Sequence, residues 1–294
     1  MKATGWVLGA AIAASTVIAP SAARADPPPP QQGADDQHFK VDPVADGVLI
    51  AAGAGTGGLL ELILSTGEIA PQRPGNTANL LSFDRVAITQ TIDTSAGTVS
   101  TIGLGLALSF AVFDPIASGF RDGWDAALVD GTMYAESLAL TMALTDITKI
   151  AVRRPRPIAY IEQAQLDAQY GGPDKSPSIS NTDATLSFFS GHAALTAAAS
   201  ATATYLAFSR APGSPRAWIT LVAGTLLTGF VSYERVRAGA HFPTDVIGGA
   251  LAGASIGVLV PHLHHRDEER PRVWIGGAPA PVGGGGTVVV QGSF

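Results

Sequence analysis

Residues 245–262 read DVIGGALAGASIGVLVPH, an apolar stretch dominated by Ala, Gly, Leu and Val. It is too long for an ordinary strand, and its length predicts a helix. Five further apolar segments are separated by breaks that contain Gly, Pro or Asp: residues 47–66, 96–113, 126–150, 192–208 and 216–233. Small residues recur at 197–201 and 248–253, which permits close approach of helices. The sequence therefore predicts an all-α fold, a bundle of about six helices.

The composition limits the classes of protein to consider. The 294-residue chain is 46% hydrophobic and only 14% charged, below the roughly 25% charged content of soluble domains. This indicates a protein that is either mostly buried helix or partly within a membrane. The net charge of -6 offers no general positive field, so we expect no nucleic-acid partner. The absence of cysteine excludes disulfides, thiolate metal ligands and cysteine nucleophiles.

The N-terminus has the features of a secretory signal peptide over residues 1–25. Lys2 precedes an apolar stretch, and Ala23-Arg24-Ala25 forms a small-x-small cleavage site. We therefore expect export to the bacterial cell envelope.

The rest of the chain divides into three parts. Residues 26–40 are rich in Pro and polar side chains and predict a disordered linker. Residues 41–265 form the predicted helical domain, and residues 266–294 a short irregular or β tail. The charged block at residues 264–270 is interpreted as a solvated helix end and not as a histidine metal site, because its carboxylates and arginines can satisfy one another.

The first motif lies at the end of the third apolar segment. Lys149 is in the last turn, and Arg156 follows seven residues later between Pro155 and Pro157. The prolines force the chain out of helical geometry, so both cations border an irregular loop. Alone, this pattern is equally consistent with cations that favour a helix C-terminus.

The second motif, Ser190-Gly191-His192, opens the fourth segment. Ser190 is a good N-cap, and Gly191 lets the backbone approach a ligand closely. The free N–H groups and the positive end of the helix dipole suit an anion such as phosphate. His192 can carry a proton near neutral pH.

The third motif is Arg235, His241 and Asp245, with Pro243 at the first position of the sixth helix. The spacing lets Asp245 meet one ring nitrogen of His241, which leaves the other nitrogen nucleophilic. Phosphoryl transfer needs such an in-line nucleophile and positive groups around the equatorial oxygens.

Together the three motifs resemble the signature of the type 2 phosphatidic-acid phosphatase and vanadium haloperoxidase superfamily. They occur in the same order, with the same internal spacings and at matching helix ends. The resemblance covers residues 126–262.

The resemblance implies a role for each motif residue. His241 would form a phosphohistidine, with Asp245 as its orienting group, and His192 would protonate the leaving group. The phosphate would be held by the remaining motif residues: Lys149, Arg156, Ser190, Gly191 and Arg235. No metal or other cofactor is implied for the phosphatase reaction.

The sequence departs from the family pattern at two positions. Phe189 stands where the family usually has Pro, and Glu234 where it often has Ser. Neither change removes a catalytic atom. The register has rivals at Arg153, Arg154 and Arg237, although the spacing favours the two arginines named above.

Several functions remain open at this point. We expect a phosphatase that hydrolyses a phosphate monoester, with a lipid phosphate or a polyprenyl diphosphate as substrate. The alternatives are a vanadate-dependent haloperoxidase, a non-specific soluble acid phosphatase of the periplasm, and a non-enzymatic scaffold that binds lipid headgroups. A halide-oxidation assay with vanadate and peroxide separates the first of these.

Membrane embedding is likewise open. The apolar segments approach the ~20 residues needed to span a bilayer, but several carry acidic residues: Glu61, Asp130, Glu136 and Asp146. The positive-inside rule favours a cytoplasmic position for the connection that contains Arg210 and Arg216. That orientation implies a periplasm-facing site, on a protein that is either membrane-embedded or periplasmic.

Overall fold

The computed structural model describes residues 39–66, 69, 72–176 and 186–265, and the backbone of residues 273–279 and 286–292. The expected signal peptide at residues 1–25 lies outside the described residues, as does the expected linker apart from its last two residues. In the expected tail, β1 (Val273–Pro279) pairs with β2 (Gly286–Gly292) as an antiparallel hairpin.

Six long helices confirm the all-α prediction for the body of the chain. Each contains most or all of one predicted segment: α1 (Pro43–Ser65), α3 (Ala96–Asp122), α4 (Trp124–Val152), α6 (Gly191–Arg210), α7 (Pro215–Arg237) and α8 (Pro243–His264). The described part has eight α-helices, not six, because α2 (Val86–Thr89) and α5 (Gln163–Tyr170) lie within stretches that lack a long apolar segment. α5 is largely polar and buries only Leu166.

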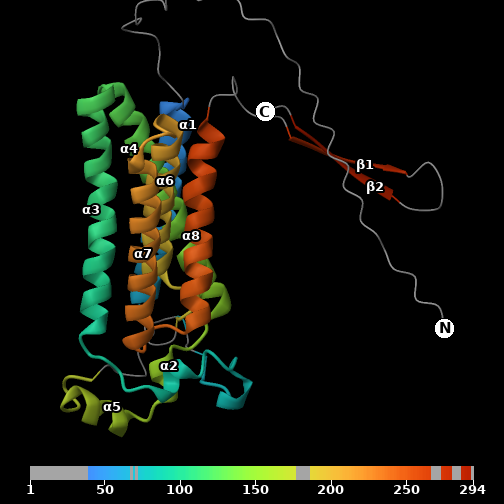
Figure 1. Ribbon diagram of the computed structural model, residues 1–294. Helices are drawn as coiled ribbons and strands as arrows, with labels where there is room; N and C mark the ends of the chain where they lie inside the picture. Colours follow the sequence, from blue (N-terminus) through green and yellow to red (C-terminus); the bar gives the residue numbers. More distant parts are fainter. Residues whose placement is uncertain are drawn as a thin grey trace, which may run out of the picture. The chain divides into compact units, whose positions relative to one another are not determined.

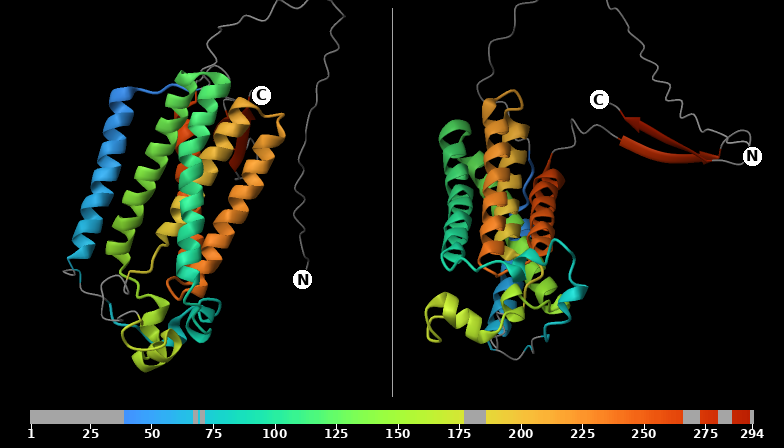
Figure 2. Two further views of the ribbon diagram at one scale, coloured as in Figure 1. Left: turned by 90° about the vertical axis from the view of Figure 1, so that its left-hand side faces the viewer. Right: turned by 60° about the horizontal axis from the view of Figure 1, so that its bottom comes forward.

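The long helices stand side by side, and successive helices run in opposite directions (Figures 1 and 2). α6 packs against α3, α4, α7 and α8, whereas α1 packs mainly along α4. The end of α4 and the starts of α6 and α8 therefore lie together, at the lower end in Figure 1, where α2 and α5 also lie. The three predicted motifs occupy these helix ends.

Glycines on α8 let it lie directly against the backbone of α6. A Cβ atom at Gly253 would lie 1.9 Å from the carbonyl oxygen of Ala194. A Cβ at Gly249 or Gly257 would meet the corresponding oxygen of Ser190 or Ala198 at 2.5 or 2.4 Å. Because these glycines recur every four residues, they form one face of the helix. This contact fixes the start of α6 beside the start of α8.

The outer surface of the bundle is rich in large apolar side chains. Exposed examples occur on every long helix except α6: Leu59 and Leu62 on α1, Ile102 and Phe120 on α3, Leu128 on α4, Leu226 on α7, and Leu251 and Leu263 on α8. Three of the described helices, α1, α3 and α8, are long and apolar enough to cross a membrane.

The α6–α8 contact predicts a large effect of a single methyl group. Gly253→Ala places its Cβ against backbone, so we expect a loss of about 1–3 kcal/mol in unfolding free energy. Gly229→Ala on α7 is the matched control, because a Cβ there meets nothing within 4 Å. That variant should be neutral or more stable by up to about 1 kcal/mol. Equal thermal midpoints for the two variants in detergent would contradict the packing.

Candidate functional site

A cavity of about 480 Å³ lies at the end of the bundle where the predicted motifs meet. Six of the eight predicted site residues line it: Lys149, Arg156, Gly191, His192, Arg235 and His241. The other two, Ser190 and Asp245, are fully buried, and the Ser190 N–H donates to the Asp245 carbonyl oxygen at 3.0 Å. The structure thus brings all three motifs together.

The end of α4 directs two cations to the cavity. Arg153 caps the helix in the left-handed conformation, with φ of 51°. The chain then leaves the helix, and Arg156 precedes the short 3₁₀ helix η2 (Pro157–Tyr160). The Ile158 N–H donates to the Gly239 carbonyl oxygen at 3.2 Å, which ties this loop to the turn between α7 and α8. The loop therefore has a fixed position relative to His241.

Lys149 is held within the cavity by acidic neighbours. Its Nζ lies 3.4 Å from Asp146 Oδ1 and 3.7 Å from Glu61 Oε1. Both carboxylates line the cavity, although the sequence indicated only that they were charges within apolar segments. His192, which also lines the cavity, has its Nε2 3.2 Å from the Thr101 hydroxyl.

The His241 ring is held differently from the arrangement that the spacing predicted. Its Nδ1 donates to the backbone carbonyl oxygen of Ser187 at 2.8 Å, whereas Asp245 Oδ2 is 3.9 Å away, beyond hydrogen-bond distance. A proton on Nδ1 leaves Nε2 as the ring nitrogen with a free lone pair. The expected tautomer, with the proton on Nδ1, is therefore set by the Ser187 carbonyl oxygen. Asp245 acts on His241 only indirectly, through Ser187.

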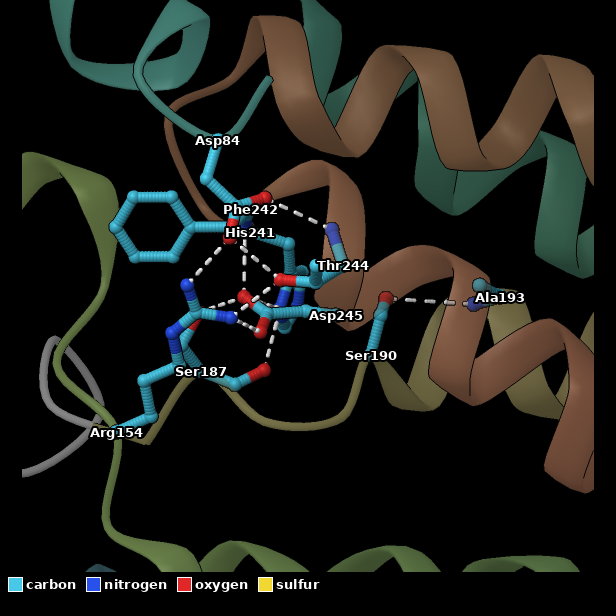
Figure 3. A network of polar contacts seen from close by, with 9 residues as sticks. All are labelled: Asp84, Arg154, Ser187, Ser190, Ala193, His241, Phe242, Thr244 and Asp245. Carbon is cyan, nitrogen blue, oxygen red and sulfur yellow. Dashed lines mark hydrogen bonds and ion pairs between the residues drawn. The ribbon is translucent and has the colours of Figure 1, made fainter. Parts of the chain in front are cut away.

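Asp245 positions the groups around His241 (Figure 3). Its Oδ2 accepts from the Ser187 hydroxyl and, at 2.7 Å, from the Phe242 N–H. Asp245 thereby links Ser187, whose carbonyl oxygen holds the His241 ring, to Phe242, which follows His241 in the chain. Asp245 Oδ1 accepts from Arg154 at 2.5 Å.

Arg154 belongs to a buried network that the sequence did not reveal. Its guanidinium bonds Asp245 and Thr244 through Nη1, and Asp84 at 2.8 Å through Nη2 (Figure 3). It also lies 4.1 Å from the centre of the Phe242 ring. Asp84 in turn accepts from the Thr244 N–H at 3.0 Å and hydroxyl at 2.8 Å. An isolated Asp in a loop gives no sequence signal for such a role.

The rival arginines have other partners. Arg153 donates to the Ile150 carbonyl oxygen, and Arg237 pairs with Asp93 and with Glu234. The Glu234 side chain, which departs from the family pattern, is thus occupied by the neighbouring arginine. Arg156 and Arg235 are the arginines that line the cavity.

The charges around His241 alter its protonation. Burial, followed by the positive charges of Arg235, Arg156 and Lys149, holds the pKa of His241 well below its usual 6.5, and the Ser187 hydrogen bond opposes this only in part. His241 is therefore neutral at physiological pH. A neutral imidazole beside three cations and a helix N-terminus suits nucleophilic attack on a bound anion.

The family model of the PAP2 superfamily matches residues 130–269 and so contains all eight predicted site residues. Through these residues the chain belongs to the PAP2 superfamily. Among solved structures, this PAP2 protein is similar to the crystal structure of the first transmembrane PAP2 type phosphatidylglycerolphosphate phosphatase from Bacillus subtilis. The identity is 19% and the TM-score 0.43, over 75% of this chain and 94% of that chain. No curated protein matches the PAP2 chain significantly.

Arg154→Gln tests the network beneath the PAP2 site. The change leaves Asp84 and Asp245 without their shared guanidinium, and breaking such a pair should cost about 3 kcal/mol of unfolding free energy. Arg153→Gln, one residue earlier, is the matched control and should change stability by no more than about 0.5 kcal/mol. Denaturation midpoints of the two variants give the comparison. A loss no greater for Arg154→Gln than for the control would exclude the proposed structural role.

Proposed function

We propose that this PAP2 protein is a phosphatase that hydrolyses a phosphate monoester through a phosphohistidine on His241. The observation that carries the proposal is the hydrogen bond from His241 Nδ1 to the Ser187 carbonyl oxygen at 2.8 Å, within a cavity lined by three cations. It leaves Nε2 unprotonated where a phosphate dianion would be held.

The binding step uses the charges of the cavity. Lys149, Arg156 and Arg235 would neutralise the equatorial oxygens, and the N–H groups at the start of α6 would donate to them. Ser190 and Gly191 open this helix, so its positive end faces the bound anion.

The chemical step follows from the two histidines. Nε2 of His241 attacks phosphorus, the bond from phosphorus to the ester oxygen breaks, and His192 gives its proton to the departing alkoxide. In the second step His192 takes a proton from water, whose oxygen attacks the phosphohistidine. The bond from phosphorus to Nε2 then breaks, which releases phosphate and restores neutral His241.

We further propose that the protein is embedded in a membrane and acts on a lipid phosphate. The exposed apolar surface of the bundle and its three sufficiently long, apolar helices support this. The cavity also has an apolar part, formed by Leu104, Met142 and Leu195, beside its charged part. A phosphorylated headgroup attached to a hydrocarbon chain matches both parts.

The acidic residues within the apolar segments do not oppose embedding. Inside the bundle, Asp146 pairs with Lys149 and Asp130 with Arg210. Glu136 is buried 3.6 Å from His264, and Glu61, which is exposed, lies 3.7 Å from Lys149. Charged side chains in membrane helices are expected to face the interior and pair in this way.

The ion pairs inside the bundle do not indicate which side of the membrane the site faces. The positive-inside argument rests on Arg210 and Arg216, and these pair at 2.7 Å with Asp130 and Asp114. An outward-facing site remains a prediction from the sequence.

The roles of the two histidines are separable with two substrates. His241→Ala should abolish both phosphate release and the phosphoenzyme. His192→Ala should slow release from an alkyl phosphate by roughly 10²–10⁴-fold. With p-nitrophenyl phosphate, whose leaving group needs no protonation, His192→Ala should instead accumulate phosphohistidine in a burst.

His262→Ala is the control for these variants, because His262 contacts Tyr205 and does not line the cavity. It should retain wild-type turnover. Wild-type turnover by His241→Ala would rule out this residue as the nucleophile.

The lowered pKa of His241 predicts the acid limb of the pH profile. The neutral ring is the reactive form, so protonation of His241 should lower kcat/KM. This decline should begin not at pH 6.5 but only near the lowered pKa of His241. Arg156→Gln removes a positive charge, raises that pKa and moves the acid limb to higher pH. Arg156→Lys keeps the charge and the limb. The substrate ionises identically in all three assays, so coincident limbs for the Gln and Lys variants would refute the electrostatic cause.

Substrate class and location can be tested in one experiment. Phosphate release is measured from phosphatidic-acid vesicles and from a soluble phosphomonoester, on membrane and soluble cell fractions. We expect the activity to sediment with membranes and to favour the lipid. Activity that stays in the soluble fraction and favours the soluble ester would support the non-specific acid phosphatase instead.

A further inference from the structure

A second cluster of ionisable side chains lies at the end of the bundle opposite the cavity. Asp46 is in the first turn of α1, Glu136 lies on α4, and His264 is the last residue of α8. His264 Nε2 is 3.1 Å from Asp46 Oδ1 and 3.6 Å from Glu136 Oε2. The two carboxylates are buried and the imidazole nearly so. Three helices thus direct potential ligands to one point.

The separations suit a bound metal ion. One ligand atom from each of Asp46, Glu136 and His264 lies within 4.8 Å of the others. In a tetrahedral site with bonds of about 2.0–2.1 Å, ligand atoms are roughly 3.3 Å apart. The two distances to His264 Nε2, 3.1 and 3.6 Å, lie on either side of that value.

The side chains are already oriented as ligands. His264 Nδ1 donates to the Val260 carbonyl oxygen at 2.8 Å, which directs Nε2 toward the two carboxylates. Asp46 Oδ2 accepts from the Asp42 N–H at 2.7 Å, which leaves Oδ1 on the side of His264. Such outer hydrogen bonds fix the tautomer and direction of metal ligands.

Glu136 provides an independent indication of a ligand. The residue is 4% exposed, and its Oε2 accepts no hydrogen bond from the part of the chain that the structure describes. A buried carboxylate oxygen without a hydrogen bond is costly, and a cation that coordinates it removes that cost. The oxygen faces His264 Nε2, into the centre of the cluster.

We propose that Asp46, Glu136 and His264 bind one divalent transition-metal ion of the Zn²⁺ type. Two carboxylates and a neutral imidazole carry a charge of −2, which the ion balances. A nitrogen ligand favours Zn²⁺ over Mg²⁺ or Ca²⁺, which prefer oxygen ligands. The ion ties the start of α1 to α4 and α8, and α1 otherwise packs mainly along α4. The site is structural, since the phosphate cavity lies at the other end of the bundle.

The test measures Zn²⁺ binding to the untagged full-length protein in detergent, after removal of metal with a chelator. The wild type should retain one Zn²⁺ per chain after dialysis and should melt at a higher temperature with Zn²⁺ than without. Glu136→Gln should bind at least about 100-fold more weakly, because even outer-shell changes cost 10–100-fold. Its melting temperature should not respond to Zn²⁺.

His262→Gln is the matched control, two residues from His264 but hydrogen-bonded to Tyr205. It should bind Zn²⁺ as the wild type does. If Glu136→Gln does not fold, Asp46→Asn replaces it, with the same expectation. The proposal is overturned if the wild type retains no stoichiometric Zn²⁺, which would make the cluster an ion triad around protonated His264. Equal binding by Glu136→Gln and His262→Gln would overturn it as well.

Discussion

The direct contact between the backbones of α6 and α8 is the constraint on which the rest of the site depends. Gly249, Gly253 and Gly257 leave no side chain between the helices, so carbonyl oxygens of α6 lie where Cβ atoms would otherwise be. The two helix starts are therefore adjacent, and the Ser190 N–H reaches the Asp245 carbonyl oxygen. One helix start carries the N–H groups that we propose bind the phosphate, and the other directly follows His241, the proposed nucleophile. A larger residue at any of these three glycines would move the two helix starts apart.

Beneath this contact, one guanidinium serves two carboxylates. Arg154 neutralises Asp84 and Asp245, and the N-terminal end of α8 adds positive potential through the Thr244 N–H. Asp245 is then free to bind the Ser187 hydroxyl and the Phe242 N–H. The His241 ring is held by the Ser187 carbonyl oxygen, and the Ser187 side chain is in turn bound by that carboxylate. The Asp245 carboxylate itself stays 3.9 Å from His241 Nδ1, beyond hydrogen-bond distance.

The bundle separates its polar and apolar surfaces with few exceptions. On α4, Asp130, Glu136 and Asp146 are buried, and Asp130 and Asp146 pair with Arg210 and Lys149. Large apolar side chains face outward on five of the six long helices. This distribution is the reverse of that in a water-soluble domain, and it is the physical basis for placing the protein in a lipid environment.

The sequence by itself determined the long helices and the residues at their ends. Apolar length, prolines and an N-cap serine act within a turn or two, and so the three motifs could be assigned to helix ends. Only the tertiary structure decided which groups meet across the fold. His241 is bound by a carbonyl 54 residues away, and Thr244 by an aspartate 160 residues away. Likewise, the sequence assigned His264 to a solvated charged block, whereas in the structure Asp46 of α1 and Glu136 of α4 lie beside it. Spacing limits only neighbours along the chain, whereas contacts between helices depend on how closely their backbones can pack.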